Sequence, residues 1–194
     1  MSAIQRIILI LAIIWIGLKL LLFYNGVAFD YFRLTLTLNF AFVAYIIFMA
    51  LKAFYLSQEK KSDFIEDFKL SLRYGFQYLL IIFGFLVIYY LYIDTNFTSE
   101  LAEANLVSVK ETVAAEGGYE QYLENHTAEF EKELYKPGTE EEFYAELKNN
   151  FTEMVSMKLM LVFMFSGFFL MCMGVSALLS ATVRKVLERS KVLQ

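Results

Sequence analysis

Two long uncharged stretches separated by a strongly acidic one constrain this chain more than any other feature. Tyr74–Ile93 runs for 20 residues without a charge, and Leu159–Val183 runs for 25. A helix needs about 20 apolar residues to cross the roughly 30 Å hydrocarbon core of a bilayer. Both stretches therefore predict membrane-spanning helices, and residues 94–156 between them predict a hydrophilic excursion from the bilayer.

Two further spans are expected nearer the N-terminus. Ile7–Tyr24 is interrupted only by Lys19, whose ammonium we expect to reach the nearer interface. Leu34–Leu51 lies between Arg33 and Lys52. A hydrophobic content of 58% with a mean hydropathy of +0.51 agrees with a membrane protein.

A cleavable signal peptide is the alternative interpretation of the first span, because Gly26-Val27-Ala28 resembles a small-residue cleavage site. Against it, Lys19 interrupts the apolar region, and the bulky Phe23 and Tyr24 lie just before that site. We therefore favour a retained helix.

These features predict an all-α fold, a four-span transmembrane helix bundle with an acidic helical extracytoplasmic insertion between spans 3 and 4. Residues 1–93 hold spans 1–3 with short loops, 94–156 form the insertion, and 157–194 hold span 4 and a basic cytoplasmic tail.

Charge is distributed unevenly along the chain. The insertion holds 15 Asp and Glu against 4 Lys, a net charge of −11, whereas the rest of the chain carries +7. Ten basic residues lie on the side of the membrane shared by both termini: Arg6, Lys52, Lys60, Lys61, Lys69, Arg73, Arg184, Lys185, Arg189 and Lys191. The positive-inside rule therefore predicts cytoplasmic termini and an external insertion. No nucleic-acid partner is expected, because phosphate binding needs clustered Lys and Arg.

The segment before span 3 predicts an interfacial helix. Asp63 is suited to cap a helix that begins at Phe64, and Asp63–Ser71 reads as an amphipathic lead-in to the membrane. A docking motif for a soluble partner is the alternative for this segment.

Three helices are predicted in the insertion. Thr95 or Thr98 is suited to cap the first, which ends near Ala115 before Gly117-Gly118. The second is Tyr119–Tyr135, followed by a turn at Lys136-Pro137-Gly138.

Thr139 and Glu142 form a capping-box pattern that opens the third helix. We expect this helix to run unbroken into span 4. So few of the insertion's residues are apolar that its helices need one another or a partner to stay folded.

Small and polar residues inside the spans are the candidate site residues. Six small ones on span 4 predict close helix packing, within the bundle or across a dimer: Cys172, Gly174, Ser176, Ala177, Ser180 and Ala181. Three polar ones predict hydrogen bonds between helices, or alternatively a solute path: Thr35, Asn39 and Gln77. Ser166, Ser176 and Ser180 would line the same path.

No catalytic set or cofactor motif is found. Cys172 is the single cysteine and His126 the single histidine, so a metal site is limited to a weak pair of His126 with Glu129. We therefore predict no catalytic residue, no metal, no cofactor and no enzymatic activity. The methionines around span 4 are read as adaptable packing.

Several local patterns resemble one protein family: Asp67-Phe68-Lys69, Tyr74-Gly75-Phe76, Tyr89–Asp94 with Asn96-Phe97, and Gly174–Leu179 before a basic tail. The chain resembles a family of small four-helix bacterial integral membrane proteins classed as a domain of unknown function. The resemblance covers about residues 60–187 and departs from the family at Thr95, where proline is expected. It implies a four-span architecture and the bacterial inner membrane, and no activity.

The function predicted from these observations is that of an accessory or structural inner-membrane protein, a subunit of a membrane complex. Its acidic insertion would contact an extracytoplasmic partner. The alternative is a transport or channel component with a polar path between its helices. Expected partners are membrane lipid and either another membrane protein or further copies of the chain.

Overall fold

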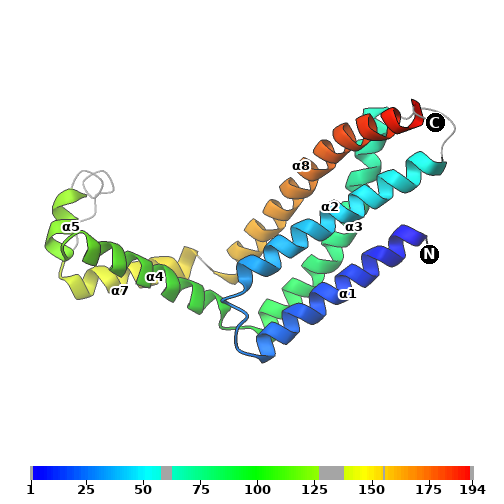
Figure 1. The fold of residues 1–194 in the computed structure, drawn as a ribbon. Helices are drawn as coiled ribbons and strands as arrows, with labels where there is room; N and C mark the ends of the chain where they lie inside the picture. The colour runs from blue at the N-terminus through cyan, green and yellow to red at the C-terminus, as the bar shows by residue number, and fades with distance from the viewer. Residues whose placement is uncertain (1, 58–62, 127–137, 155, 193–194) are drawn as a thin grey trace. The chain divides into compact units, whose positions relative to one another are not determined.

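The computed structural model describes residues 2–57, 63–126, 138–154 and 156–192. Every regular element in these ranges is helical. Four helices are long and apolar enough to cross a membrane: α1 (Ala3–Tyr24), α2 (Phe32–Ser57), α3 (Phe64–Ile88) extended by the π-helical turn η1 (Tyr89–Ile93), and α8 (Met157–Val192) over its part up to Val183. Among the described residues between η1 and α8 there are three shorter ones: α4 (Phe97–Ala115), α5 (Tyr119–Asn125) and α7 (Glu140–Met154) (Figure 1).

The chain divides into two compact units. The first, the membrane bundle, comprises residues 1–93 and 161–194. The second comprises residues 94–160 and contains the whole insertion, residues 94–156.

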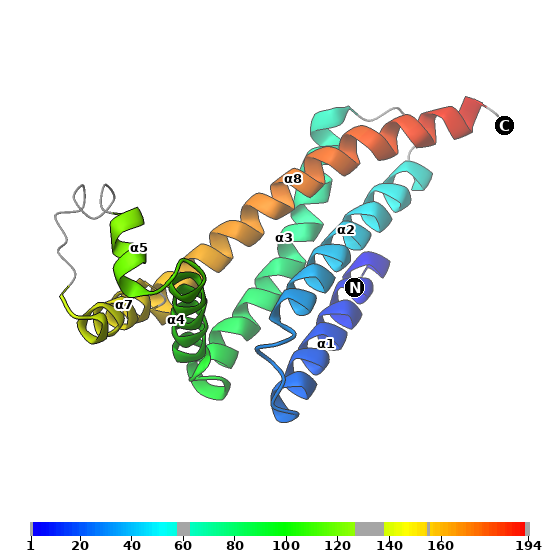
Figure 2. The same ribbon diagram turned by 60° about the vertical axis from the view of Figure 1, so that its left-hand side comes forward.

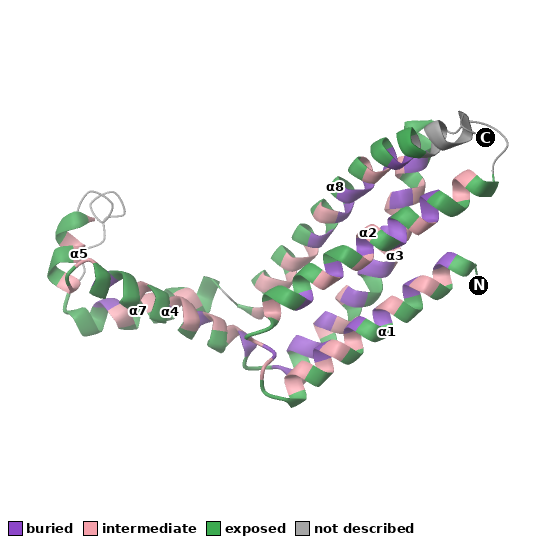
Figure 3. Cartoon of the chain, viewed as in Figure 1, coloured by how far each residue is buried: buried purple, intermediate pink, exposed green. Residues whose placement is uncertain are grey.

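In the membrane bundle, α1, α2 and α3 pack against one another, and α8 lies farthest from α1 in both ribbon views (Figures 1 and 2). Buried positions recur along the facing sides of these helices (Figure 3). The core is mainly aliphatic, with fully enclosed side chains that include Val43, Ile46 and Ile47 of α2 and Ile82 of α3. Outward-facing side chains such as Ile13 and Leu170 are apolar and exposed, as expected of surfaces that face lipid.

Two helix starts in the bundle depend on side-chain caps. The predicted cap at Asp63 is confirmed, since its carboxylate accepts a 2.7 Å hydrogen bond from the backbone N–H of Glu66. The first span begins earlier than predicted, at Ala3, because Ser2 and Gln5 form a capping box.

In the insertion, α4 packs against α7. As predicted, α4 ends at Ala115, because Gly117 and Gly118 adopt positive φ values of 101° and 106°. Neither Thr95 nor Thr98 caps this helix: its N-cap is Asn96, whose side chain makes no capping bond.

The capping box of Thr139 and Glu142 is confirmed, with each side chain bonded to the other's backbone N–H. The second predicted helix is present from Tyr119 to Asn125, and its remainder and the Lys136-Pro137 part of the turn lie outside the described residues.

The prediction that the last insertion helix runs unbroken into span 4 is wrong. The helix α7 ends at Met154, and α8 begins at Met157. Ser156 lies between them without helical structure, and its carbonyl accepts the N–H of Met160 at 2.9 Å. Serine is among the residues favoured at the position before a helix, which agrees with a new helix start here.

Candidate functional site

A buried lysine lies near the end of the bundle where α1 meets α2 and η1. Only 1% of Lys19 is exposed, and its Nζ lies 4.9 to 5.7 Å from the ring centres of Phe32, Tyr89 and Tyr90. The expectation that this ammonium reaches the interface is therefore wrong, because the protein encloses it. Cation–π contacts of this kind contribute about 0.5–2 kcal/mol each, so Lys19 ties α1 to α2 and η1.

Beside it, α1 and α2 are joined by a hydrogen bond. The indole N–H of Trp15 donates to the carbonyl of Thr35 at 2.9 Å, and the Thr35 hydroxyl donates to the carbonyl of Phe32. A cavity of about 10 Å³ adjoins Trp15, Lys19 and Thr35. It is the size of a single water molecule, so this end of the bundle is closely packed.

Deeper in the bundle, Asn39, Tyr78 and Ser176 have buried polar atoms without a hydrogen-bond partner among the described residues. Asn39 is fully buried, and neither amide atom has a hydrogen-bond partner among the described residues. The hydroxyl of buried Tyr78 also has no hydrogen-bond partner among the described residues. Of the other predicted polar candidates, Thr35 is buried and Gln77 is half-buried, whereas Ser166 is exposed.

The six packing candidates on α8 divide by face. Cys172, Ser176 and Ser180 are buried, Ala177 is half-buried, and Gly174 and Ala181 are exposed.

The buried face of α8 meets small residues of α3. The hydroxyl oxygens of Ser180 and Ser71 lie 3.1 Å apart, and a Cβ placed on Gly75 would lie 2.7 Å from Sγ of Cys172. These contacts define the α3–α8 seam, made of Ser71, Gly75, Cys172 and Ser180.

A buried carboxylate near the start of α3 was not expected from the sequence. Asp67 has no exposed surface, and it accepts a 2.6 Å hydrogen bond from the hydroxyl of Tyr55 on α2. Asp67 precedes Ser71, which is also buried, by four residues, so the two share one face of α3. This spacing is the sequence signal that Asp67 faces the interior of the bundle.

The insertion presents two acidic helix faces. On α4, Glu100, Glu103 and Glu111 surround the exposed Val107 at helical spacing. On α7, Glu142, Glu146 and Glu153 share one exposed face. Within the described part of the chain, no ion pair neutralises these six carboxylates.

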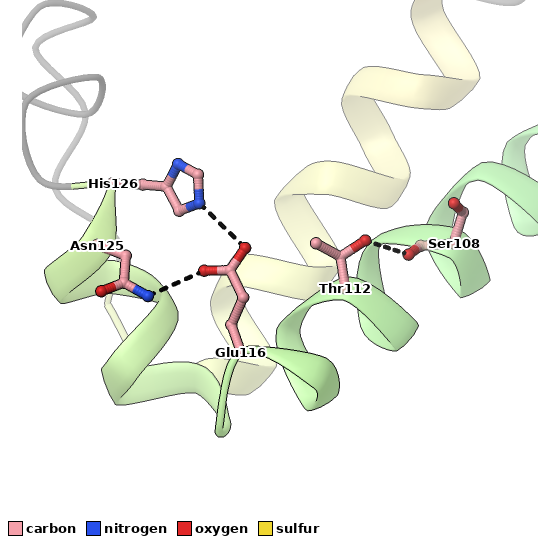
Figure 4. Close-up of polar contacts among 5 residues, drawn as sticks. All are labelled: Ser108, Thr112, Glu116, Asn125 and His126. Atoms are coloured by element: carbon pink, nitrogen blue, oxygen red, sulfur yellow. Dashed lines mark hydrogen bonds and ion pairs between the residues drawn. The ribbon is translucent and has the colours of Figure 1, made fainter.

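The junction of α4 and α5 holds a small polar cluster. The Glu116 carboxylate points between two residues at the end of α5 (Figure 4): it accepts from the amide of Asn125 at 3.1 Å and lies 3.3 Å from Nε2 of His126. Glu129, the ligand considered with His126, lies outside the described residues. No group of three metal-ligating side chains occurs among those that are described.

These contacts lower the pKa of Glu116 from its ordinary value of 4.5, chiefly through the Asn125 amide and then through His126. Because the pKa of Glu116 is lower in the folded chain, these contacts stabilise the fold above pH 4.5, and this stabilisation is lost as the pH falls through the pKa of the folded state.

We expect Asn125→Ala to raise the pKa of Glu116 toward 4.5, measured by carboxyl NMR titration of the full chain in micelles. Gln121→Ala, on the exposed side of α5, should leave the titration unchanged; an equal rise in both variants would contradict the assignment.

Comparison with known proteins gives no relative: no family model, no curated protein and no solved structure matches this chain. The resemblance to a family of small four-helix membrane proteins therefore stays a prediction.

Proposed function

We propose that the chain is an accessory subunit of a membrane protein complex and that its acidic insertion binds a partner with a cationic surface. The observation that carries the proposal is the exposed acidic face of α4, where Glu100, Glu103 and Glu111 flank an apolar side chain, Val107, that is 48% exposed. An apolar centre with a charged rim is the usual anatomy of a protein interface.

The small core of the insertion supports a binding role. Its buried apolar side chains are few among the described residues: Phe97, Ala102, Leu106, Val113 and Phe143. Burial of this extent stabilises a helical hairpin only weakly, whereas a partner that covers an acidic face would add both contact area and charge complementarity.

A transport role is less well supported by the interior of the bundle. Asn39 and the Ser71–Ser180 contact are separated along the helices by enclosed aliphatic side chains, among them Val43, Ile47 and Leu79. A solute path would need these side chains to move apart. What favours a path is the presence of buried polar atoms without a hydrogen-bond partner among the described residues, chiefly the amide of Asn39.

The proposed topology places both termini in the cytoplasm and the insertion on the outer side of a bacterial inner membrane. It is supported by the ten basic residues on the side of the termini and by four helices of spanning length.

Site-specific photocrosslinking in native membranes tests the binding role. We expect a photoreactive residue at position 107 to give an adduct with a second protein, and the same residue at Ser108, turned about 100° round the helix, to give little. Changing Glu100, Glu103 and Glu111 to Gln should reduce the adduct several-fold, whereas changing them to Asp, which keeps the charge, should preserve it. Equal adducts at both positions, or insensitivity to the Gln changes, would refute the proposal.

A further inference from the structure

An apolar groove runs along the outer surface of the membrane bundle between α2 and α8. It has a volume of about 580 Å³ and is lined by Phe32, Leu36 and Phe40 on one side and by Gly167, Phe168 and Met171 on the other. Thr37 is its polar member, and the Thr37 hydroxyl is already bonded to the Arg33 carbonyl at 2.9 Å. The groove therefore offers its occupant almost only hydrocarbon contacts.

One end of the groove is charged. Arg33 is exposed, follows Phe32 of the groove directly in the chain, and precedes Thr37 and Phe40 by four and seven residues, so it shares their helix face at the end of the groove. It also lies in the first turn of α2, which contains no acidic residue, and the helix dipole favours an anion there. Asp30, exposed in the turn before α2, adds one negative charge. An apolar slot next to a chain segment that carries one positive and one negative group, Arg33 and Asp30, is suited to an acyl chain attached to a zwitterionic headgroup.

We propose that this groove binds one acyl chain of a zwitterionic glycerophospholipid, with the lipid phosphate at Arg33 and the first turn of α2. The groove has open space at Gly167, where an added Cβ would meet no atom within 4 Å, so a larger side chain here would enter the groove. Gly174 is equally unobstructed, lies two turns further along nearly the same face of α8, and does not line the groove. Gly174 is therefore a matched control position for substitutions at Gly167.

Quenching of tryptophan fluorescence by brominated lipid measures occupancy of the groove. Trp15 is the single tryptophan, and the cavity beside it shares Met164 and Phe168 with the groove. In vesicles of phosphatidylethanolamine with dibrominated chains, we expect the quenching of Trp15 in Gly167→Leu to fall at least twofold below that of the unsubstituted chain. Gly174→Leu should be quenched as strongly as the unsubstituted chain. Equal quenching in both variants would overturn the proposal.

Native mass spectrometry of the full chain from micelles containing phosphatidylethanolamine gives an independent readout. We expect a retained phospholipid that is lost in Gly167→Leu and reduced several-fold in Arg33→Gln, with diacylglycerol, which lacks the phosphate, retained less. A second copy of the chain in the groove would instead give a dimer that Gly167→Leu converts to monomer without loss of lipid, and this result would overturn the lipid assignment.

Discussion

Gly75→Ala is expected to weaken the membrane bundle by about 1–3 kcal/mol, the usual cost of inserting one methyl group into a filled core. The added Cβ would lie 2.7 Å from Sγ of Cys172 and 3.2 Å from Cδ1 of Ile47. Both neighbours are fully enclosed, so neither can move away without displacing its own surroundings. Unfolding of the purified chain by increasing the SDS fraction in mixed micelles, followed by Trp15 fluorescence, measures the loss.

Two further variants make this test specific for the α3–α8 seam. Gly84→Ala changes another glycine of α3 at an exposed position with no atom within 4 Å, so it should be neutral or slightly stabilising. Combining Gly75→Ala with Cys172→Ala removes the obstructing sulfur and should recover most of the loss. If the double variant were as unstable as the sum of the two single ones, the proposed contact would not exist.

The seam also illustrates how far the sequence can predict this bundle. The spacing of small residues on span 4 indicates that one face of this helix packs closely. Small residues occur at helical spacing on its lipid-facing side as well, so the spacing alone does not say which face is covered by protein. Cys172 and Ser176 are buried whereas Gly174, between them, is exposed. Which face is covered depends on α3, whose Ser71 and Gly75 lie about a hundred residues earlier in the chain.

Charged groups were harder to place than apolar ones. Hydropathy located all four long helices, because a continuous run of apolar residues is a local property. The burial of Lys19 and Asp67 depends instead on residues far away in the sequence. The ring of Tyr89 lies against the ammonium of Lys19, and the hydroxyl of Tyr55 bonds to the carboxylate of Asp67. In the insertion, the sequence predicts the capping box correctly because its two partners, Thr139 and Glu142, lie within four residues of each other.

Asn39→Leu is expected to stabilise the bundle by about 1–3 kcal/mol, which is the usual cost of burying a polar group without a hydrogen bond. The amide is fully enclosed and has no partner within the described structure, whereas leucine has the same number and branching of side-chain heavy atoms and no polar atom. The same SDS titration should therefore show a higher midpoint for this variant. Thr37→Val, an exposed polar-to-apolar change on the same helix, should shift the midpoint little.

Liposome flux and the adduct at position 107, measured on the Asn39→Leu variant, separate the two functions considered for the chain. A subunit that only needs a stable bundle gains from Asn39→Leu and should keep its adduct at position 107, because α2 contributes nothing to the acidic face of α4. A transporter that binds solute at this amide would gain stability in the same way but would lose flux in liposomes. A gain in stability with unchanged flux and an unchanged adduct would leave the polar path without its strongest support, since that alternative rests on the Asn39 amide, which has no partner among the described residues.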